Sequence, residues 1–134
     1  MSAAELAPGK WDFEKSENFD EYMKALGVGM AMRLIGSKAR PSQEISIVDD
    51  LWTIKTSTPL KNTQIQFKLD VPFEEQTADG RKVKTTCSVS GNKLIQEQKG
   101  DISSTIIREF SKENFVMTLK AVDVVCTRYY KKSQ

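Results

Sequence analysis

The amino-acid sequence predicts an all-β fold: an antiparallel up-and-down β-barrel of about ten strands, capped by a short helix-turn-helix. Three observations favour this fold. Apolar and polar residues alternate with a period of two from Pro41 onward, short turn segments divide that region, and two amphipathic helical patterns precede it. The length of 134 residues fits one domain, residues 1–134.

The N-terminal region predicts a strand followed by a helix. Residues 9–17 alternate aromatic and charged side chains, which indicates a strand with one buried face. Residues 18–27 place apolar side chains at i, i+3, i+4 and i+7. We expect Asn18 to cap this helix, Glu21 to complete a capping box and Gly27 to end it.

A second short helix is predicted over residues 29–38. It would place Met30 and Leu34 on one side, with Ile35 as a further candidate for that side. We expect Gly36 to stop the helix and Pro41 to prevent any continuation. The two helices form a helix-turn-helix in the geometric sense only.

The rest of the chain reads as strands joined by tight turns. An open sheet of this size would leave long unpaired edges, so closure into a barrel is expected. A barrel of about ten strands is slightly too wide for side chains to fill, which leaves an internal ligand cavity. The further strands are expected at 42–48, 51–58, 62–69, 71–77, 82–90, 93–100, 104–112, 114–122 and 124–132.

Composition excludes several classes of protein. The 20 basic and 18 acidic residues are scattered and give a net charge of +2, so we expect no nucleic-acid partner. Histidine is absent, which removes the usual general base and the commonest metal ligand, so we expect no metal, cofactor or enzymatic activity. Without a signal peptide or an apolar run long enough for a membrane span, a cytoplasmic location is expected. Cys87 and Cys126 read as packing thiols, although pairing stays open.

Two arginines lie on strands whose faces are mixed. In residues 114–122 the alternation places Phe115, Met117 and Leu119 inside. In residues 104–112 and 124–132, either face could point inward, so the pattern leaves Arg108 and Arg128 open between a buried position and the surface.

Three long stretches resemble the intracellular lipid-binding proteins, the family of cytosolic fatty-acid-binding and cellular retinoid-binding proteins. They are "GKWDFEKSENFDEYMKALGVGMAMR", "LKNTQIQFKLDVPFEEQTADGRKVKT" and "VVCTRYYKK". The resemblance implies a ten-stranded barrel that holds a fatty acid or retinoid. It also implies that Arg108, Arg128 and Tyr130 face inward as a carboxylate clamp, in which two guanidinium groups and a phenol bind the acid.

The resemblance further implies a portal formed by the second helix and the turns at 57–61 and 78–81. For each candidate lining residue, ordinary core packing is an equal alternative. The lining candidates are Phe19, Met23, Met30, Met117 and Leu119, and the portal turns contribute Leu60, Ala78 and Asp79. Cations near the portal could favour transient contact with anionic membranes, although simple solvation also explains them; they are Lys24, Arg33, Lys38 and Lys61.

The leading functional hypothesis is a monomeric, non-enzymatic carrier of a long-chain fatty acid or a similar hydrophobic carboxylate. A retinoic-acid-binding protein of the same family is the alternative, since the same clamp serves both acids. A lipid-modifying enzyme and a pure interaction protein are the remaining classes, and the first is disfavoured because no "GxSxG" motif occurs. Ala7 and Pro8 replace the usual aromatic of relatives, so the sequence does not define how the closed end is plugged.

Overall fold

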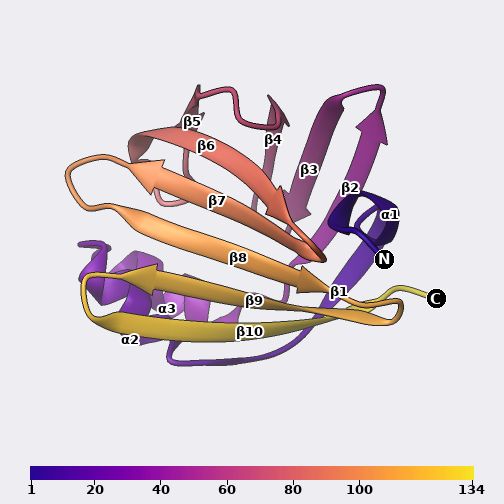
Figure 1. Ribbon diagram of the computed structural model, residues 1–134. Coiled ribbons are helices and arrows are strands. Elements are labelled where there is room, and N and C mark those ends of the chain that lie inside the picture. The colour runs from indigo at the N-terminus through magenta and orange to yellow at the C-terminus, as the bar shows by residue number, and fades with distance from the viewer.

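A computed structural model describes residues 1–134 as a single ten-stranded antiparallel sheet with three short helices (Figure 1). The helices are α1 (Ala3–Leu6), α2 (Phe19–Ala25) and α3 (Met30–Lys38). The strands are β1 (Gly9–Glu17), β2 (Ser42–Val48), β3 (Leu51–Ser57), β4 (Asn62–Lys68), β5 (Phe73–Gln76), β6 (Lys82–Ser90), β7 (Lys93–Lys99), β8 (Ser104–Phe110), β9 (Asn114–Ala121) and β10 (Val124–Lys132).

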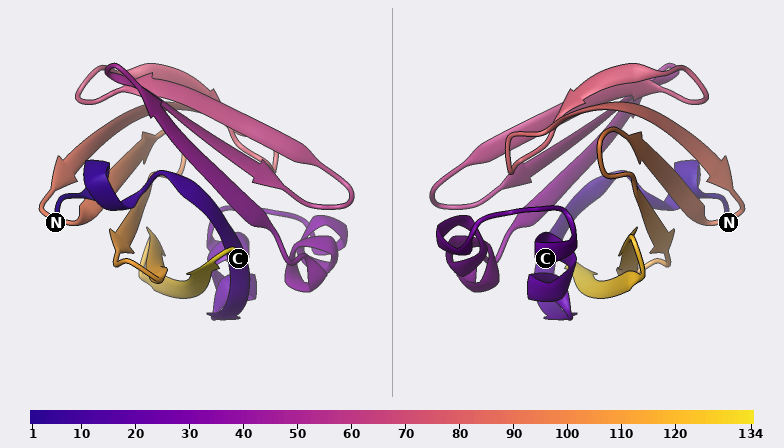
Figure 2. Two further views of the ribbon diagram at one scale, coloured as in Figure 1. Left: turned by 90° about the vertical axis from the view of Figure 1, so that its right-hand side faces the viewer. Right: turned by 90° about the vertical axis from the view of Figure 1, so that its left-hand side faces the viewer.

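The sheet curves round into a barrel that is closed except at one seam. Its strand order is β4-β3-β2-β1-β10-β9-β8-β7-β6-β5, so β1 pairs with both β2 and β10 while β4 and β5 are not paired with each other. Figure 2 shows the sheet from its two sides as it wraps around the interior. The predicted up-and-down barrel is therefore confirmed, with an interruption between β4 and β5.

The faces that the alternation left open are now defined. On β8 and β10, Arg108 and Arg128 are 4% and 5% exposed, so both guanidinium groups point inward. On β9, Phe115, Met117 and Leu119 are buried, as predicted. The inner surface of the three C-terminal strands thus combines apolar side chains with two cations.

Helix α1 was not predicted, and it plugs the closed end of the barrel. Ser2 and Glu5 form a capping box, a signal that the S-x-x-E spacing carries in the sequence. Ala7 directly follows the helix and is fully buried, and its carbonyl oxygen accepts a 2.9 Å hydrogen bond from Trp11 Nε1. Trp11 also packs edge-on against Phe115. A small helix and the buried Ala7 that follows it therefore close this end of the barrel against Trp11.

Helices α2 and α3 cover the opposite end (Figure 1) and differ in detail from expectation. Asn18 has a φ of 68° and makes no cap, so the predicted capping box is wrong; its Nδ2 instead donates to the carbonyl of Val125 at 3.0 Å. Gly27, with a φ of 84°, follows the end of α2 as predicted. None of the helices is long and apolar enough to cross a membrane.

The predicted stop at Gly36 is also wrong, because α3 continues to Lys38. Gly36 serves helix packing instead. A Cβ atom at this position would lie 2.9 Å from the Met23 sulfur of α2, so the absence of a side chain allows the two helices to approach closely.

Val122 occupies a strained position in the turn between β9 and β10. Its φ is 56°, a region that β-branched residues avoid and that asparagine tolerates. Because Val122 is 79% exposed, the substitution Val122→Asn removes little packing. We expect it to raise the free energy of unfolding by about 1 kcal/mol, measured by urea denaturation.

Val48→Asn is the matched control, since Val48 is 67% exposed but does not have a positive φ. This variant should gain no stability, because asparagine is a poor strand residue. Equal changes in the two variants would show that backbone strain at Val122 is not the cause.

Candidate ligand-binding site

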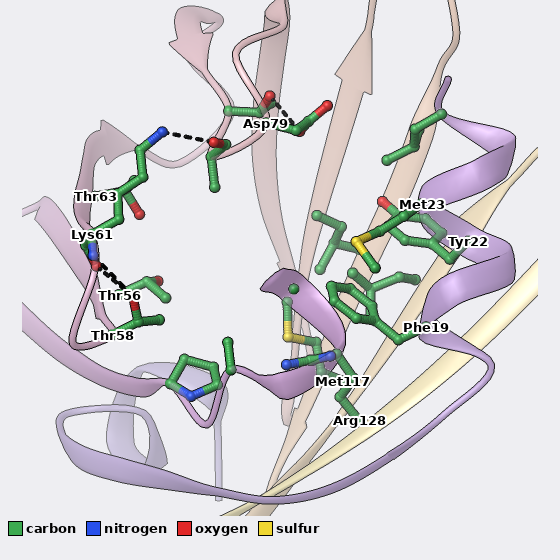
Figure 3. A pocket seen from close by; sticks show the side chains of 18 of the residues that line it. Phe19, Tyr22, Met23, Thr56, Thr58, Lys61, Thr63, Asp79, Met117 and Arg128 are labelled. Carbon is green, nitrogen blue, oxygen red and sulfur yellow. Dashed lines mark hydrogen bonds between the residues drawn. The ribbon is translucent and has the colours of Figure 1, made fainter. Parts of the chain in front are cut away.

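The barrel and its helical lid enclose a cavity of about 330 Å³. Its wall combines apolar side chains of α2, α3 and the strands with inward-facing polar groups (Figure 3). The predicted site residues that line it are Phe19, Met23, Leu60, Ala78, Asp79, Arg108, Met117, Leu119, Arg128 and Tyr130.

Met30 is the exception among the predicted lining residues. It is 76% exposed and lies outside the cavity wall, which α3 instead lines with Met32 and Ile35. Met32 and Ile35 are three residues apart and therefore share one helical face, whereas Met30 does not lie on it. The short amphipathic pattern of α3 therefore included Ile35 as a candidate but wrongly grouped it with Met30 and missed Met32.

Arg108 is held by acceptors from two different strands. Its Nε donates to Gln43 Oε1 of β2 at 3.1 Å, and its NH1 donates to Gln96 Oε1 of β7 at 2.9 Å. Burial lowers the pKa of Arg108, although the nearby Glu75 carboxylate acts against this effect. Guanidinium groups keep their proton in proteins, so Arg108 is a charged group held by neutral amides.

Glu75 of β5 extends this network. Its Oε1 accepts hydrogen bonds from Thr85 Oγ1 at 2.8 Å, Gln96 Nε2 at 3.0 Å and Gln98 Nε2 at 3.1 Å. Gln96 therefore links the positive Arg108 to the negative Glu75. Sequence reasoning missed these glutamines and Glu75, although their inward position in the strand alternation was a usable signal.

Arg128 has a different environment from Arg108. Its guanidinium carbon lies 3.9 Å from the ring centroid of Phe19 and 4.7 Å from that of Phe13, at the distance of cation–π contacts. It makes no ion pair and no hydrogen bond to another protein group, and it lines the cavity (Figure 3). Tyr130 stacks on Phe115 at 4.7 Å, and its hydroxyl group also has no protein partner.

The lid end is tied to the barrel by a few polar contacts. Tyr22 of α2 shares a 2.5 Å hydrogen bond with Ser104 of β8, and burial raises the pKa of Tyr22. Lys61 Nζ donates to the carbonyl of Ala78 at 2.7 Å, which joins the β3–β4 turn to the β5–β6 turn. These two turns thus meet beside the seam between β4 and β5.

The two cysteines do not belong to a reactive site. Both are free and fully buried, and burial raises the pKa of Cys87 to about 12 and that of Cys126 to about 11. A thiol with such a pKa is almost entirely protonated at neutral pH and is a poor nucleophile.

A lidded barrel with an internal cavity and inward-facing cations has the architecture of a small-ligand-binding barrel protein. The model of the lipocalin / cytosolic fatty-acid-binding protein family matches residues 8–133, and the chain belongs to this family.

Individual relatives cover nearly the whole chain. A protein of Doryteuthis pealeii named sodium/calcium exchanger regulatory protein 1 is 55% identical, over 97% of this chain and 98% of that protein. The muscle fatty acid-binding protein of Schistocerca gregaria is 49% identical, over 95% and 96% respectively. The structure of the REP1-NXSQ fatty acid transporter has a TM-score of 0.93 at 53% identity and covers 96% of both chains.

Gln96 is the bridge between the two buried charges, and this makes it sensitive to substitution. Gln96→Leu would remove an acceptor from Arg108 and a donor from Glu75, both within the barrel. We expect a loss of about 3 kcal/mol in the free energy of unfolding, since hydrogen bonds to buried charged groups are lost without replacement.

Glu97→Leu provides the matched control on the same strand. Glu97 is exposed on the outer face of β7, and a change there should alter stability by less than about 0.5 kcal/mol. If urea denaturation gave the two variants the same stability, the bridging role of Gln96 would be refuted.

Proposed function

We propose that this protein is a non-enzymatic carrier that holds a long-chain fatty acid in its barrel cavity, with the carboxylate bound by Arg108, Arg128 and Tyr130. It acts as a monomer in the cytoplasm. Family membership and the relatives named for fatty acids support this proposal. The main observation behind the proposal is that Arg128 is buried in the cavity wall without an ion pair or a hydrogen bond to the protein.

A buried cation is costly unless an anion or water accompanies it. Arg128 is 5% exposed, carries no protein carboxylate partner and lines the cavity, so its guanidinium is available to a ligand acid. The neighbouring Tyr130 hydroxyl can donate to the same carboxylate. Arg108 donates one N–H group to each of two glutamines, and its remaining N–H groups are available to the same carboxylate.

The apolar part of the cavity supplies most of the binding free energy. Burying a chain of about fifteen methylenes contributes on the order of 12 kcal/mol before the cost of ordering the ligand is subtracted. That cost is roughly 4 to 15 kcal/mol, and the charged hydrogen bonds offset part of it. The arginines therefore determine how the acid is oriented in the cavity, whereas the apolar contacts contribute most of its affinity.

Retinoic acid is the second candidate ligand. Its carboxylate suits the same three donors. The named fatty-acid relatives favour the fatty acid as the primary ligand. The name of the Doryteuthis pealeii protein indicates a regulatory role for that relative, and the present proposal does not include such a role.

The lid end is also part of the proposal, as a surface for transient contact with anionic membranes. Helix α3 buries no residue, and Met30, Leu34 and Leu60 are exposed near the portal. Of the four cations expected there, Lys38 alone is free of an intramolecular ion pair or hydrogen bond; the paired ones are Lys24, Arg33 and Lys61.

Arg128→Gln tests the role of this cation in headgroup binding. We expect about tenfold or greater loss of affinity for oleate and a much smaller loss for oleyl alcohol, because one charged hydrogen bond contributes roughly 1.5 to 3 kcal/mol. The measurement is displacement of a fluorescent anionic fatty-acid probe from delipidated protein. The unliganded variant should be at least as stable as the wild type, because an unpaired buried charge is removed.

Arg40→Gln is the control, since Arg40 also lies over the Phe13 ring, at 5.2 Å, but is exposed. It should leave both affinities unchanged. Equal losses for acid and alcohol in Arg128→Gln would refute the headgroup role.

The same displacement assay distinguishes the two candidate ligands. Delipidated protein is challenged separately with oleate and with all-trans retinoic acid. We expect oleate to displace the probe at the lower concentration, because its flexible chain can follow an irregular cavity. Stronger displacement by retinoic acid would assign the retinoid alternative, and no probe binding would refute the carrier proposal.

A further inference from the structure

Glu75 places a carboxylate in the wall of a cavity that otherwise attracts carboxylates. The side chain is 8% exposed and belongs to β5, at the seam. All three of its hydrogen bonds go to Oε1, from Thr85, Gln96 and Gln98. Its second oxygen, Oε2, accepts no hydrogen bond from the protein. This oxygen also keeps some accessible surface, and Glu75 lines the cavity. Oε2 is therefore an acceptor that is open to the cavity.

A second unpartnered acceptor lies beside Glu75. Gln98 is 3% exposed and also lines the cavity, and its Oε1 is buried without a hydrogen-bond partner. The orientation of this amide is fixed, because only its NH₂ group can donate to the Glu75 carboxylate. Gln98 Oε1 is sealed from the cavity, so Glu75 Oε2 is the acceptor of this pair that a ligand can reach. Unpartnered buried acceptors are uncommon in folded proteins and call for a donor.

We propose that the cavity contains a second polar subsite, built on Glu75, which accepts a hydrogen bond from a hydroxyl group on the ligand chain. The subsite rests on the proposed carrier function and narrows its ligand class to oxygenated fatty acids that carry a hydroxyl group along the chain. The carboxylate binds at Arg128 and Tyr130, and the hydroxyl group donates to Glu75 Oε2.

The charges around the cavity select a neutral donor. A ligand carboxylate is repelled by Glu75, and an ammonium group is repelled by Arg108 and Arg128, which line the same space. A hydroxyl group carries no charge and can donate to a carboxylate oxygen. A keto group at the same carbon can only accept, and it would place its oxygen against Oε2. The hydroxy and keto forms of one acid therefore differ in whether the ligand oxygen that faces Glu75 Oε2 can donate a hydrogen bond.

The experiment compares three sets of ligands in the probe-displacement assay on delipidated protein. They are stearate, a positional series of hydroxystearates and the matching oxostearates. At the position that reaches Glu75, we expect the hydroxy acid to bind about tenfold tighter than its oxo partner, as a hydrogen bond to a charged acceptor predicts.

Glu75→Gln tests the assignment to this residue. The variant keeps an oxygen for the three donors and replaces Oε2 with an NH₂ group, so the preference should vanish or reverse toward the oxo acid. Glu74→Gln is the matched control, because Glu74 is the exposed neighbour on the same strand, and it should keep the wild-type preference.

Each result has a definite meaning for the subsite. Equal binding of hydroxy and oxo acids at every position of the wild-type protein would overturn it, whether or not Glu75→Gln folds. A hydroxy preference that survives in Glu75→Gln would also overturn the assignment. Displacement by stearate with no hydroxy preference rejects the subsite alone, whereas failure of stearate and all its derivatives rejects the carrier function and the subsite together.

Discussion

The need to compensate a guanidinium inside the barrel governs the arrangement of its polar interior. Arg108 on β8 takes acceptors from β2 and β7, and β2 is not a neighbour of β8 in the sheet. Gln96 in turn donates a hydrogen bond to Glu75 of β5. Strands that share no ladder hydrogen bonds are therefore connected through the interior. A barrel that cannot fill its centre with apolar side chains gains cross-connections in this way.

The two inward arginines have divided roles because their surroundings differ. Arg108 is anchored to Gln43 and Gln96 and is linked through Gln96 to the negative Glu75, so it belongs to the framework as well as to the cavity wall. Arg128 lies over the faces of Phe13 and Phe19. These cation–π contacts offset part of the cost of burying the charge and leave the hydrogen-bond donors unoccupied. Because Phe19 belongs to α2, the unpaired donors of Arg128 and the position of α2 are coupled through one aromatic contact.

The positions of the strands could be predicted from the sequence. The orientation and contacts of the polar side chains inside the barrel could not. Period-two alternation between turn signals located the strands, and Phe115, Met117 and Leu119 were correctly assigned to the inner face of β9. The same pattern could not orient Arg108 or Arg128, because charged and apolar residues occupy both faces of β8 and β10; the family resemblance decided this. Asn18 failed as a cap because its side chain reaches Val125, a contact distant in sequence. The Gln96 to Glu75 network is likewise a product of strand order, which no local pattern contains.

Helix α3 buries none of its residues, and this determines which part of the molecule opens most easily. Detaching α3 from the barrel would uncover Met23 of α2 but no buried side chain of α3 itself, and it would break few polar contacts, so the free energy of such an opening lies far below that of global unfolding. A helix of 9 residues also has little stability of its own once it is detached. Local melting of α3 can therefore admit or release a molecule from the interior while every strand keeps its ladder of hydrogen bonds.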